Sequence, residues 1–251
     1  MTRAFPTGVV EAGNALTAVA GSYLRTVTVG NWDACVTCAL PVNGYMRCPQ
    51  CQRHHDSGLP VADRAGFLVY ADKPGSQAYR TMFGYKEERL RASFEPIVRG
   101  LLTVGLRAHF ACAMKLSGSA SRGWAVVPST KGRDVFARLV HALARDVDSE
   151  VSVRFTGAAP GRELHPAAWE IPVERPLPEH VVVIDDSWVT GASSQSLAIA
   201  LHDAGVAHVS ILSVARVLSP EWTPNPPFIR TVLPGLAYDW RTCPWTRGEC
   251  P

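Results

Sequence analysis

Two adjacent carboxylates followed by a hydroxyl-rich loop form the stretch of the chain with the clearest chemical meaning. Residues 181–194 read VVVIDDSWVTGASS, so Asp185 and Asp186 follow four β-branched residues and precede Thr190 and Gly191. Backbone amides at the start of a helix favour a phosphate group, and glycine lets the main chain approach it closely. The acids repel phosphate, but they can accept hydrogen bonds from sugar hydroxyls beside it. The stretch therefore predicts a ribose 5-phosphate site.

The elements that must position these residues are a buried strand and the helix that follows it. The run of β-branched residues is typical of a strand covered on both faces, as in a parallel sheet. The following helix is expected to place Leu197, Leu201 and Ala204 on one face and to stop at Gly205. The apolar run 209–217 predicts the next strand. Ligands of open α/β sheets bind beyond the carboxyl ends of the strands, which is where the acids fall.

A second strand, loop and helix precede this unit. Residues 124–133 read WAVVPSTKGR, and an amphipathic helix pattern follows them. Lys131 and Arg133, together with Ser129 and amides at the helix start, can bind a pyrophosphate group. An ordinary polar turn remains the alternative, because Lys-Gly-Arg is common in turns.

The stretch 181–194 resembles the signature of type I phosphoribosyltransferases, which is an apolar strand, two acids and a Thr/Gly-rich loop. It differs from the commonest form at Val189 and Ser193, where threonine is usual. The resemblance implies that Asp185 and Asp186 are catalytic, and that phosphoribosyl pyrophosphate (PRPP) is bound as a Mg²⁺ chelate. The implied PRPP-binding residues are Ser187, Trp188, Val189, Thr190, Gly191, Ala192, Ser193, Ser194, Ser129, Lys131 and Arg133. A receiver domain and a plain strand–helix turn are the alternatives.

Four cysteines near the amino end form a second motif. Cys35 and Cys38 make one C-x-x-C pair, and Cys48 and Cys51 make the other. Two such pairs complete a tetrahedral thiolate site, so we predict structural zinc in a small ribbon with a hairpin near residues 43–44. An iron centre and a pair of redox dithiols are the alternatives. The neighbouring His54 and His55 are expected to be solvated.

The order of these motifs resembles the competence protein ComF family of predicted phosphoribosyltransferases. A four-cysteine ribbon comes first, then a tyrosine-containing strand at 66–71, then Lys86 beside Tyr85, and finally the phosphoribosyltransferase signature. The resemblance implies an α/β fold with a mostly parallel sheet flanked by helices. It also implies two parts, an N-terminal segment with the ribbon (1–62) and a phosphoribosyltransferase-like domain (63–251).

Composition limits the remaining possibilities. The chain has 251 residues, of which 47% are hydrophobic and 19% charged, as in a folded globular protein. A net charge of +3 allows anionic ligands without requiring nucleic acid. We expect no membrane span and no signal peptide, and clustered cysteines suggest a reducing, cytoplasmic setting.

The rest of the chain yields weaker predictions. The Pro- and Gly-bearing connection 156–180 follows a short strand at 151–155 and is long enough to be functional or mobile. The family resemblance implies that it is a lid, with Arg162 and His165 as its polar candidates. Cys243 and Cys250 make half of a four-ligand metal site, so they can pair, share a cation with histidines or simply pack. Cys112 is expected to be an inert buried thiol.

The predicted function is transfer of a phosphoribosyl group to a base or amine that no residue identifies. The ComF-like Arg-Gly-aromatic-Asn-Gln segment has no counterpart in the chain. A non-catalytic regulator that binds PRPP or a nucleotide, or a competence accessory protein whose ribbon contacts DNA or another protein, is therefore the alternative.

Overall fold

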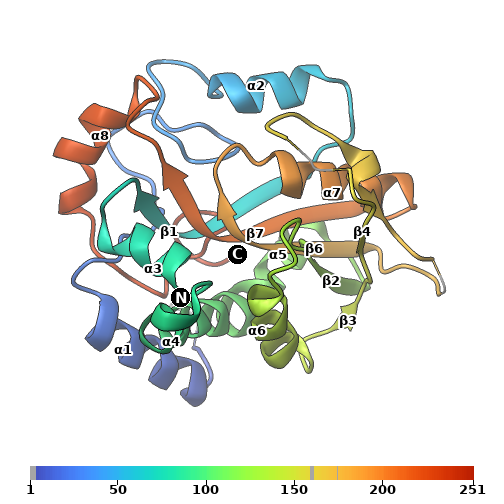
Figure 1. Ribbon diagram of the computed structural model, residues 1–251, viewed down its shortest axis with the longest axis horizontal. Helices are drawn as coiled ribbons and strands as arrows, with labels where there is room; N and C mark the ends of the chain where they lie inside the picture. Colours follow the sequence, from blue (N-terminus) through green and yellow to red (C-terminus); the bar gives the residue numbers. More distant parts are fainter. Residues whose placement is uncertain (1–3, 159–160, 174) are drawn as a thin grey trace.

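Five parallel strands form the central sheet of the structure, a computed structural model that describes residues 4–158, 161–173 and 175–251 (Figure 1). In spatial order the strands are β1 (Arg64–Asp72), β7 (His208–Leu218), β6 (His180–Trp188), β2 (Arg122–Val126) and β3 (Ser149–Glu150). Every neighbouring pair runs parallel. The predicted α/β class with a parallel sheet is confirmed.

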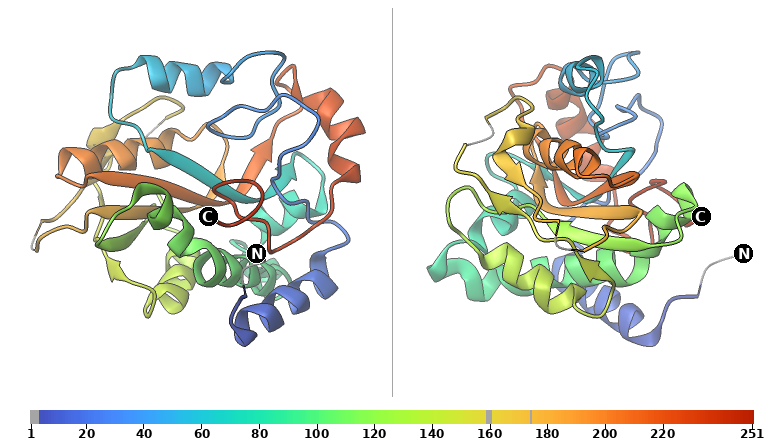
Figure 2. Two further views of the ribbon diagram at one scale, coloured as in Figure 1. Left: turned by 180° about the vertical axis from the view of Figure 1, so that it is seen from behind. Right: turned by 90° about the vertical axis from the view of Figure 1, so that its right-hand side faces the viewer.

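Helices cover both faces of this sheet (Figures 1 and 2). One face carries α1 (Thr7–Ala20), α3 (Gln77–Gly84), α4 (Glu88–Val104), α5 (Phe110–Ser117) and α6 (Val135–Ala144). The other face carries α2 (Pro49–Asp56), α7 (Ala192–Asp203) and α8 (Asn225–Thr231). The sheet therefore separates two hydrophobic cores, one under each layer of helices.

The central strand β6 is buried as its sequence predicts, but it is longer than expected. Val181 to Ile184 are fully buried. Pairing with β7 continues to Trp188, so both acids and Ser187 belong to the end of the strand and not to the loop. This leaves only a short turn before α7, which holds the acid pair close to the start of that helix.

The helices α4 and α5 are joined without a break by a π-helical turn at Gly105–His109, so together they form one long helical stretch. The stretch begins at Glu88, well before Pro96. Glu88–Ser117 is long and apolar enough to cross a membrane, and 72% of its most apolar window is buried inside the protein.

The connection 156–180 carries structure of its own. Of the strand expected at 151–155, only Arg154–Phe155 (β4) forms, and the edge strand β3 already ends at Glu150. β4 pairs antiparallel with β5 (Trp169–Glu170), which follows a short 3-10 turn at Pro166–Ala168. The buried ring of Trp169 donates from Nε1 to the carbonyl of Ser193, so this segment packs onto the start of α7.

The four-cysteine segment packs directly on the sheet and differs from the expected ribbon. Its backbone pairing is an isolated bridge between Ala34 and Pro41, and the second cysteine pair lies at the start of α2. The hydroxyl of Tyr70 on β1 donates to the carbonyl of Ala39 at 2.9 Å. The expected boundary at residues 62 and 63 marks the start of the sheet, but the two parts share both hydrophobic cores.

The sheet changes winding direction between β2 and β6. The chain leaves β2 through α6 on one face and reaches β3 at the near edge. It leaves β6 through α7 on the opposite face and reaches β7, which lies on the side of β6 away from β2. Diverging connections of this kind open a crevice at the carboxyl ends of the two strands, where ligands of α/β proteins bind.

Candidate functional site

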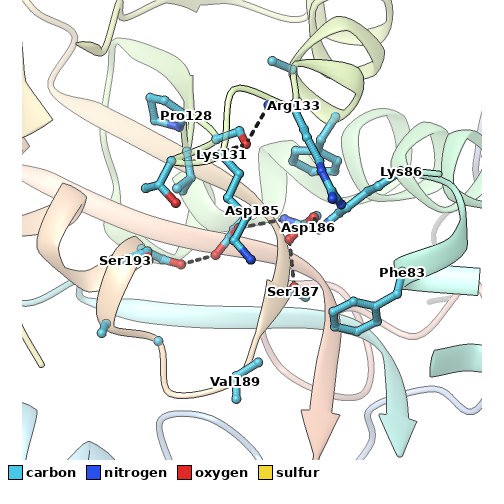
Figure 3. Close-up of a pocket in the computed structure, with 18 of the residues that line it drawn as sticks. Phe83, Lys86, Pro128, Lys131, Arg133, Asp185, Asp186, Ser187, Val189 and Ser193 are labelled. Carbon is cyan, nitrogen blue, oxygen red and sulfur yellow. Dashed lines mark hydrogen bonds and ion pairs between the residues drawn. The ribbon is translucent and has the colours of Figure 1, made fainter. Parts of the chain in front are cut away.

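A cleft of about 460 Å³ lies at this crevice and gathers the residues predicted from the sequence (Figure 3). Its walls come from the end of β6, the start of α7, the loop between β2 and α6, and the end of α3. Of the predicted residues, it is lined by Ser129, Lys131, Arg133, Asp185, Asp186, Ser187, Val189, Thr190, Gly191, Ala192, Ser193 and Ser194. The two motifs therefore share one site.

Trp188 is the predicted residue that does not line the cleft. Its ring is buried, with 1% of the residue exposed, and packs edge-on against Phe67 at 5.4 Å between centroids. The ring lies directly under Gly191, where an added Cβ would come within 2.1 Å of it. Trp188 therefore supports the loop from below and does not contact the ligand with its ring.

The loop between β6 and α7 has the geometry of an anion site. Gly191 occupies the N-cap position with φ +81°, a conformation that side-chain-bearing residues rarely adopt, and as a glycine it has no side chain with which to cap the helix. The amide of Ala192 reaches the hydroxyl of Thr190 at 3.3 Å. Helix amides and the helix dipole together favour a phosphate here. Val189, where the signature usually has threonine, is exposed at the rim.

Asp185 is held rigidly at the floor of the cleft. One carboxylate oxygen accepts the amide of Asp186 at 2.8 Å, and the other accepts the hydroxyl of Ser194. Burial and the neighbouring charge of Asp186 raise the pKa of Asp185 to about 7. An acid whose pKa lies near neutrality is typical of a functional site.

Asp186 makes three polar contacts around its carboxylate. Lys86 forms an ion pair with it, and the hydroxyl of Tyr85 donates to the same oxygen at 2.8 Å. Ser187 donates to the second oxygen, also at 2.8 Å. Burial and the acid raise the pKa of Tyr85 above its ordinary value, which keeps the phenol protonated as a donor. Lys86 thus partly neutralises the acid pair.

The loop between β2 and α6 presents exposed basic side chains. The amides of Lys131 and Arg133 both donate to the hydroxyl of Ser129, at 3.3 and 3.1 Å. Ser129 thus already accepts from these two amides, which precede the helix; the amides predicted to bind an anion are those at the start of α6, at Val135. The long side chains of Lys131 and Arg133 extend over the cleft opposite the acid pair and remain available to an anion (Figure 3).

Sequence reasoning assigned no site role, or only a tentative one, to several lining residues. Phe83, Tyr85 and Lys86 come from the end of α3, and Arg162 comes from the expected lid. Among these lining residues, Tyr85 and Lys86 stand out in the sequence because a lysine beside an aromatic residue is part of the family resemblance. His165 is instead fixed outside the cleft, where its amide donates to the hydroxyl of Ser196 at 2.7 Å. Among the described residues, four basic and two acidic side chains line the cleft, a balance that favours an anionic ligand.

The four cysteines near the amino end converge as predicted. The sulfurs of Cys35, Cys38, Cys48 and Cys51 all lie within 4.8 Å of one another, and all four residues are buried. The sulfurs of Cys38 and Cys48 are 3.7 Å apart, compared with about 3.8 Å between two thiolates on one tetrahedral zinc ion. The cluster is therefore compatible with a bound zinc ion that has no open coordination position.

The surroundings of this cluster correct one prediction. His54 is buried rather than solvated and bonds to Gln50 at 2.8 Å, because α2 packs against the segment that carries Arg162. His55 is exposed, as expected.

No protein-family model matches the chain, and no curated protein is similar to it in sequence.

Proposed function

We propose that this protein is a phosphoribosyltransferase, which binds PRPP with Mg²⁺ and transfers the phosphoribosyl group to a base or amine. One observation carries the proposal. The acid pair, the uncapped start of α7 and two basic side chains line a single cleft at the switch point of the sheet. A sugar with a phosphate on one end and a pyrophosphate on the other matches that distribution of charge.

The 5-phosphate would lie at the start of α7, where Thr190 and Ser193 add hydroxyl donors to the helix amides. Asp185 and Asp186 would accept hydrogen bonds from the ribose hydroxyls. In the transition state the anomeric carbon becomes positive as pyrophosphate leaves, and fixed carboxylates stabilise that charge. Lys131 and Arg133 would bind the departing pyrophosphate.

Mg²⁺ would enter the site with PRPP, bound mainly through oxygens of the pyrophosphate. Asp185 and Asp186 are the carboxylates among the described residues that line the cleft, and Lys86 already pairs with one of them. The protein would therefore contribute charge balance and orientation, and the ion would offset the negative charge of the leaving group.

We also propose that the four-cysteine cluster holds zinc in a structural role. Four thiolates are typical of structural zinc sites, and all four positions come from the protein. A minor alternative is an iron centre, which elemental analysis separates from zinc.

The second candidate function is a PRPP or nucleotide sensor without transferase activity, in which the cysteine segment contacts DNA or another protein. It is favoured by the contacts of Lys86 and Tyr85 with Asp186, because they offset the negative charge that would stabilise the transition state of transfer. The two functions differ in turnover. The transferase releases pyrophosphate from PRPP and Mg²⁺ in the presence of one member of a panel of bases and amines, whereas the sensor binds PRPP without release.

A further inference from the structure

A second group of metal-binding side chains lies on the opposite face of the sheet from the first cysteine cluster. It consists of His109, Cys112, Cys243 and Cys250, whose ligand atoms all lie within 4.8 Å of one another. The first three residues are buried and Cys250 is partly exposed. The C-terminal loop that carries the last two cysteines lies against the α4–α5 stretch in both views of Figure 2.

The hydrogen bonds of His109 leave the correct nitrogen facing the thiols. Its Nε2 lies 2.9 Å from the carbonyl of Trp240, which can only accept, so Nε2 carries the proton. The lone pair on Nδ1 then points toward the sulfur of Cys250, 3.5 Å away. A nitrogen and a sulfur bound to one tetrahedral zinc ion lie about 3.6 Å apart. A carbonyl bonded to the second nitrogen is the usual way in which proteins orient a ligand histidine.

The local backbone brings these four residues together from distant parts of the chain. His109 ends the π turn, and Cys112 lies three residues later on the same side of α5. A backbone bridge between Cys243 and Gly248 closes the C-terminal loop and turns Cys250 back toward the helix. The ring of Trp245 donates from Nε1 to the carbonyl of His109 at 2.8 Å, which fixes the loop against the π turn.

We propose that His109, Cys112, Cys243 and Cys250 bind a second zinc ion with a structural role. Three thiolates and one imidazole form a complete tetrahedral set, so no coordination position is left for a substrate. The two clusters together account for all seven cysteines of the chain. This inference is independent of the proposed transferase function.

The second ion would fasten the carboxyl end of the chain to the helical layer. It would also fix Arg247, whose guanidinium donates to the carbonyls of Cys35 and Val36 at 3.2 and 2.9 Å. The C-terminal loop that the second ion would hold therefore contacts the backbone of the first cysteine pair through Arg247. A structural ion at this position would stabilise the C-terminal loop and, through Arg247, the first cysteine pair.

Metal content tests the proposal directly. The full-length protein, purified under reducing conditions and exchanged against excess zinc, is expected to hold two zinc ions per chain by elemental mass spectrometry. Cys250→Ser, chosen because Cys250 is the most exposed of the four, is expected to hold one. His109→Ala is also expected to hold one, and His109→Cys is expected to restore the second ion because a thiolate replaces the imidazole.

The control is His141→Gln, which removes an exposed histidine outside both clusters and is expected to keep two ions. Substitution of the wild type with Co²⁺ gives a readout that does not depend on a variant, since a site with three sulfurs and one nitrogen differs in its absorption spectrum from a site with four sulfurs. One ion per chain in the wild type would overturn the proposal. Iron in place of zinc would also overturn it, as would a disulfide between Cys243 and Cys250 in protein purified under reducing conditions. Two ions per chain in both Cys250→Ser and His109→Ala would overturn it as well.

Discussion

The guanidinium of Arg216 donates from Nε to the carbonyl of Cys38 at 2.8 Å. The same side chain, 1% exposed, donates from Nη1 to the carbonyls of Trp188 and Val189, at 3.1 and 3.3 Å. Arg216, a buried residue of β7, thus joins the four-cysteine cluster to the end of β6 and the turn that follows it. The cysteine segment therefore supports the backbone at the end of β6, beside the cleft.

This connection predicts that Arg216→Met weakens both sites together. The substitution keeps much of the apolar stem but leaves buried carbonyls without their donor, which costs about 2–4 kcal/mol of unfolding free energy. We expect faster zinc loss to a chromogenic chelator and weaker PRPP binding by calorimetry. Arg230→Met, a change at an exposed residue of α8, serves as the control. Unchanged zinc release together with unchanged PRPP affinity would show that the connection has no energetic role.

Gly191→Ala tests the loop itself. The new Cβ would meet the Trp188 ring at 2.1 Å in a backbone conformation with φ +81°, so the loop must move. We expect PRPP affinity to fall at least about 10-fold, which corresponds to about 1.4 kcal/mol.

Gly205→Ala is the matched control, because Gly205 also has a positive φ, of +102°, but no atom lies within 4 Å of its added Cβ. It is expected to lose about 1–2 kcal/mol of unfolding free energy and to retain PRPP affinity. Equal losses of affinity in the two variants would count against a role for this loop.

The loop between β2 and α6 is expected to bind the pyrophosphate group of PRPP through Lys131 and Arg133. Lys131→Ala combined with Arg133→Ala should lower the affinity for PRPP by about 10- to 100-fold and reduce its salt dependence, because two cations of the cleft are lost. Ribose 5-phosphate should bind the variant and the wild type similarly. Arg138→Ala is the control, since Arg138 pairs with Asp134 on the exposed side of α6. If both ligands weakened to the same extent, the assignment of this loop to pyrophosphate would be wrong.

The raised pKa of Asp185 predicts a pH dependence of stability. The carboxyl has a pKa of about 7 in the folded protein and about 3.8 in the unfolded chain, so between these values the folded state holds more protons. The unfolding free energy contributed by this group therefore falls as pH rises from about 4 to about 7, and it is constant above that range.

Asp185→Asn removes this titration. Relative to wild type, the variant should become more stable through the same pH window, by about 1–3 kcal/mol at pH 8, while losing PRPP affinity. Chemical denaturation of both proteins at pH 4, 6 and 8 measures the difference. A difference in stability that does not change with pH would contradict the assigned pKa.

The parts of the fold that depend on local pattern were predictable from the sequence. The β-branched run at 181–184, the turn with Gly191 and the helix after it follow from short-range preferences, and so does the convergence of two closely spaced cysteine pairs. The position of Trp188 was not predictable, because strand pairing with β7 extends β6 beyond its apolar run. The burial of His54 likewise reflects packing of α2 against a distant segment, where the side chain of Gln50 donates to the carbonyl of Arg162.

Contacts between distant segments account for the rest. Lys86 and Asp186 lie 100 positions apart in the sequence, and only the tertiary placement of the turn after α3 near the end of β6 decides that they pair. Cys112 was expected to be inert because its partners, Cys243 and Cys250, are more than a hundred residues away in the sequence. No spacing rule connects them, since the π turn and the C-terminal loop set their approach.

Titration calorimetry with PRPP and Mg²⁺ tests the central claim most directly. The wild type and Asp203→Asn, which alters an exposed acid at the far end of α7, are expected to bind one PRPP per chain. Asp185→Asn combined with Asp186→Asn is expected to lose binding while remaining folded. Equal binding by all three proteins, or no binding by the wild type, would contradict a phosphoribosyl site at the end of β6.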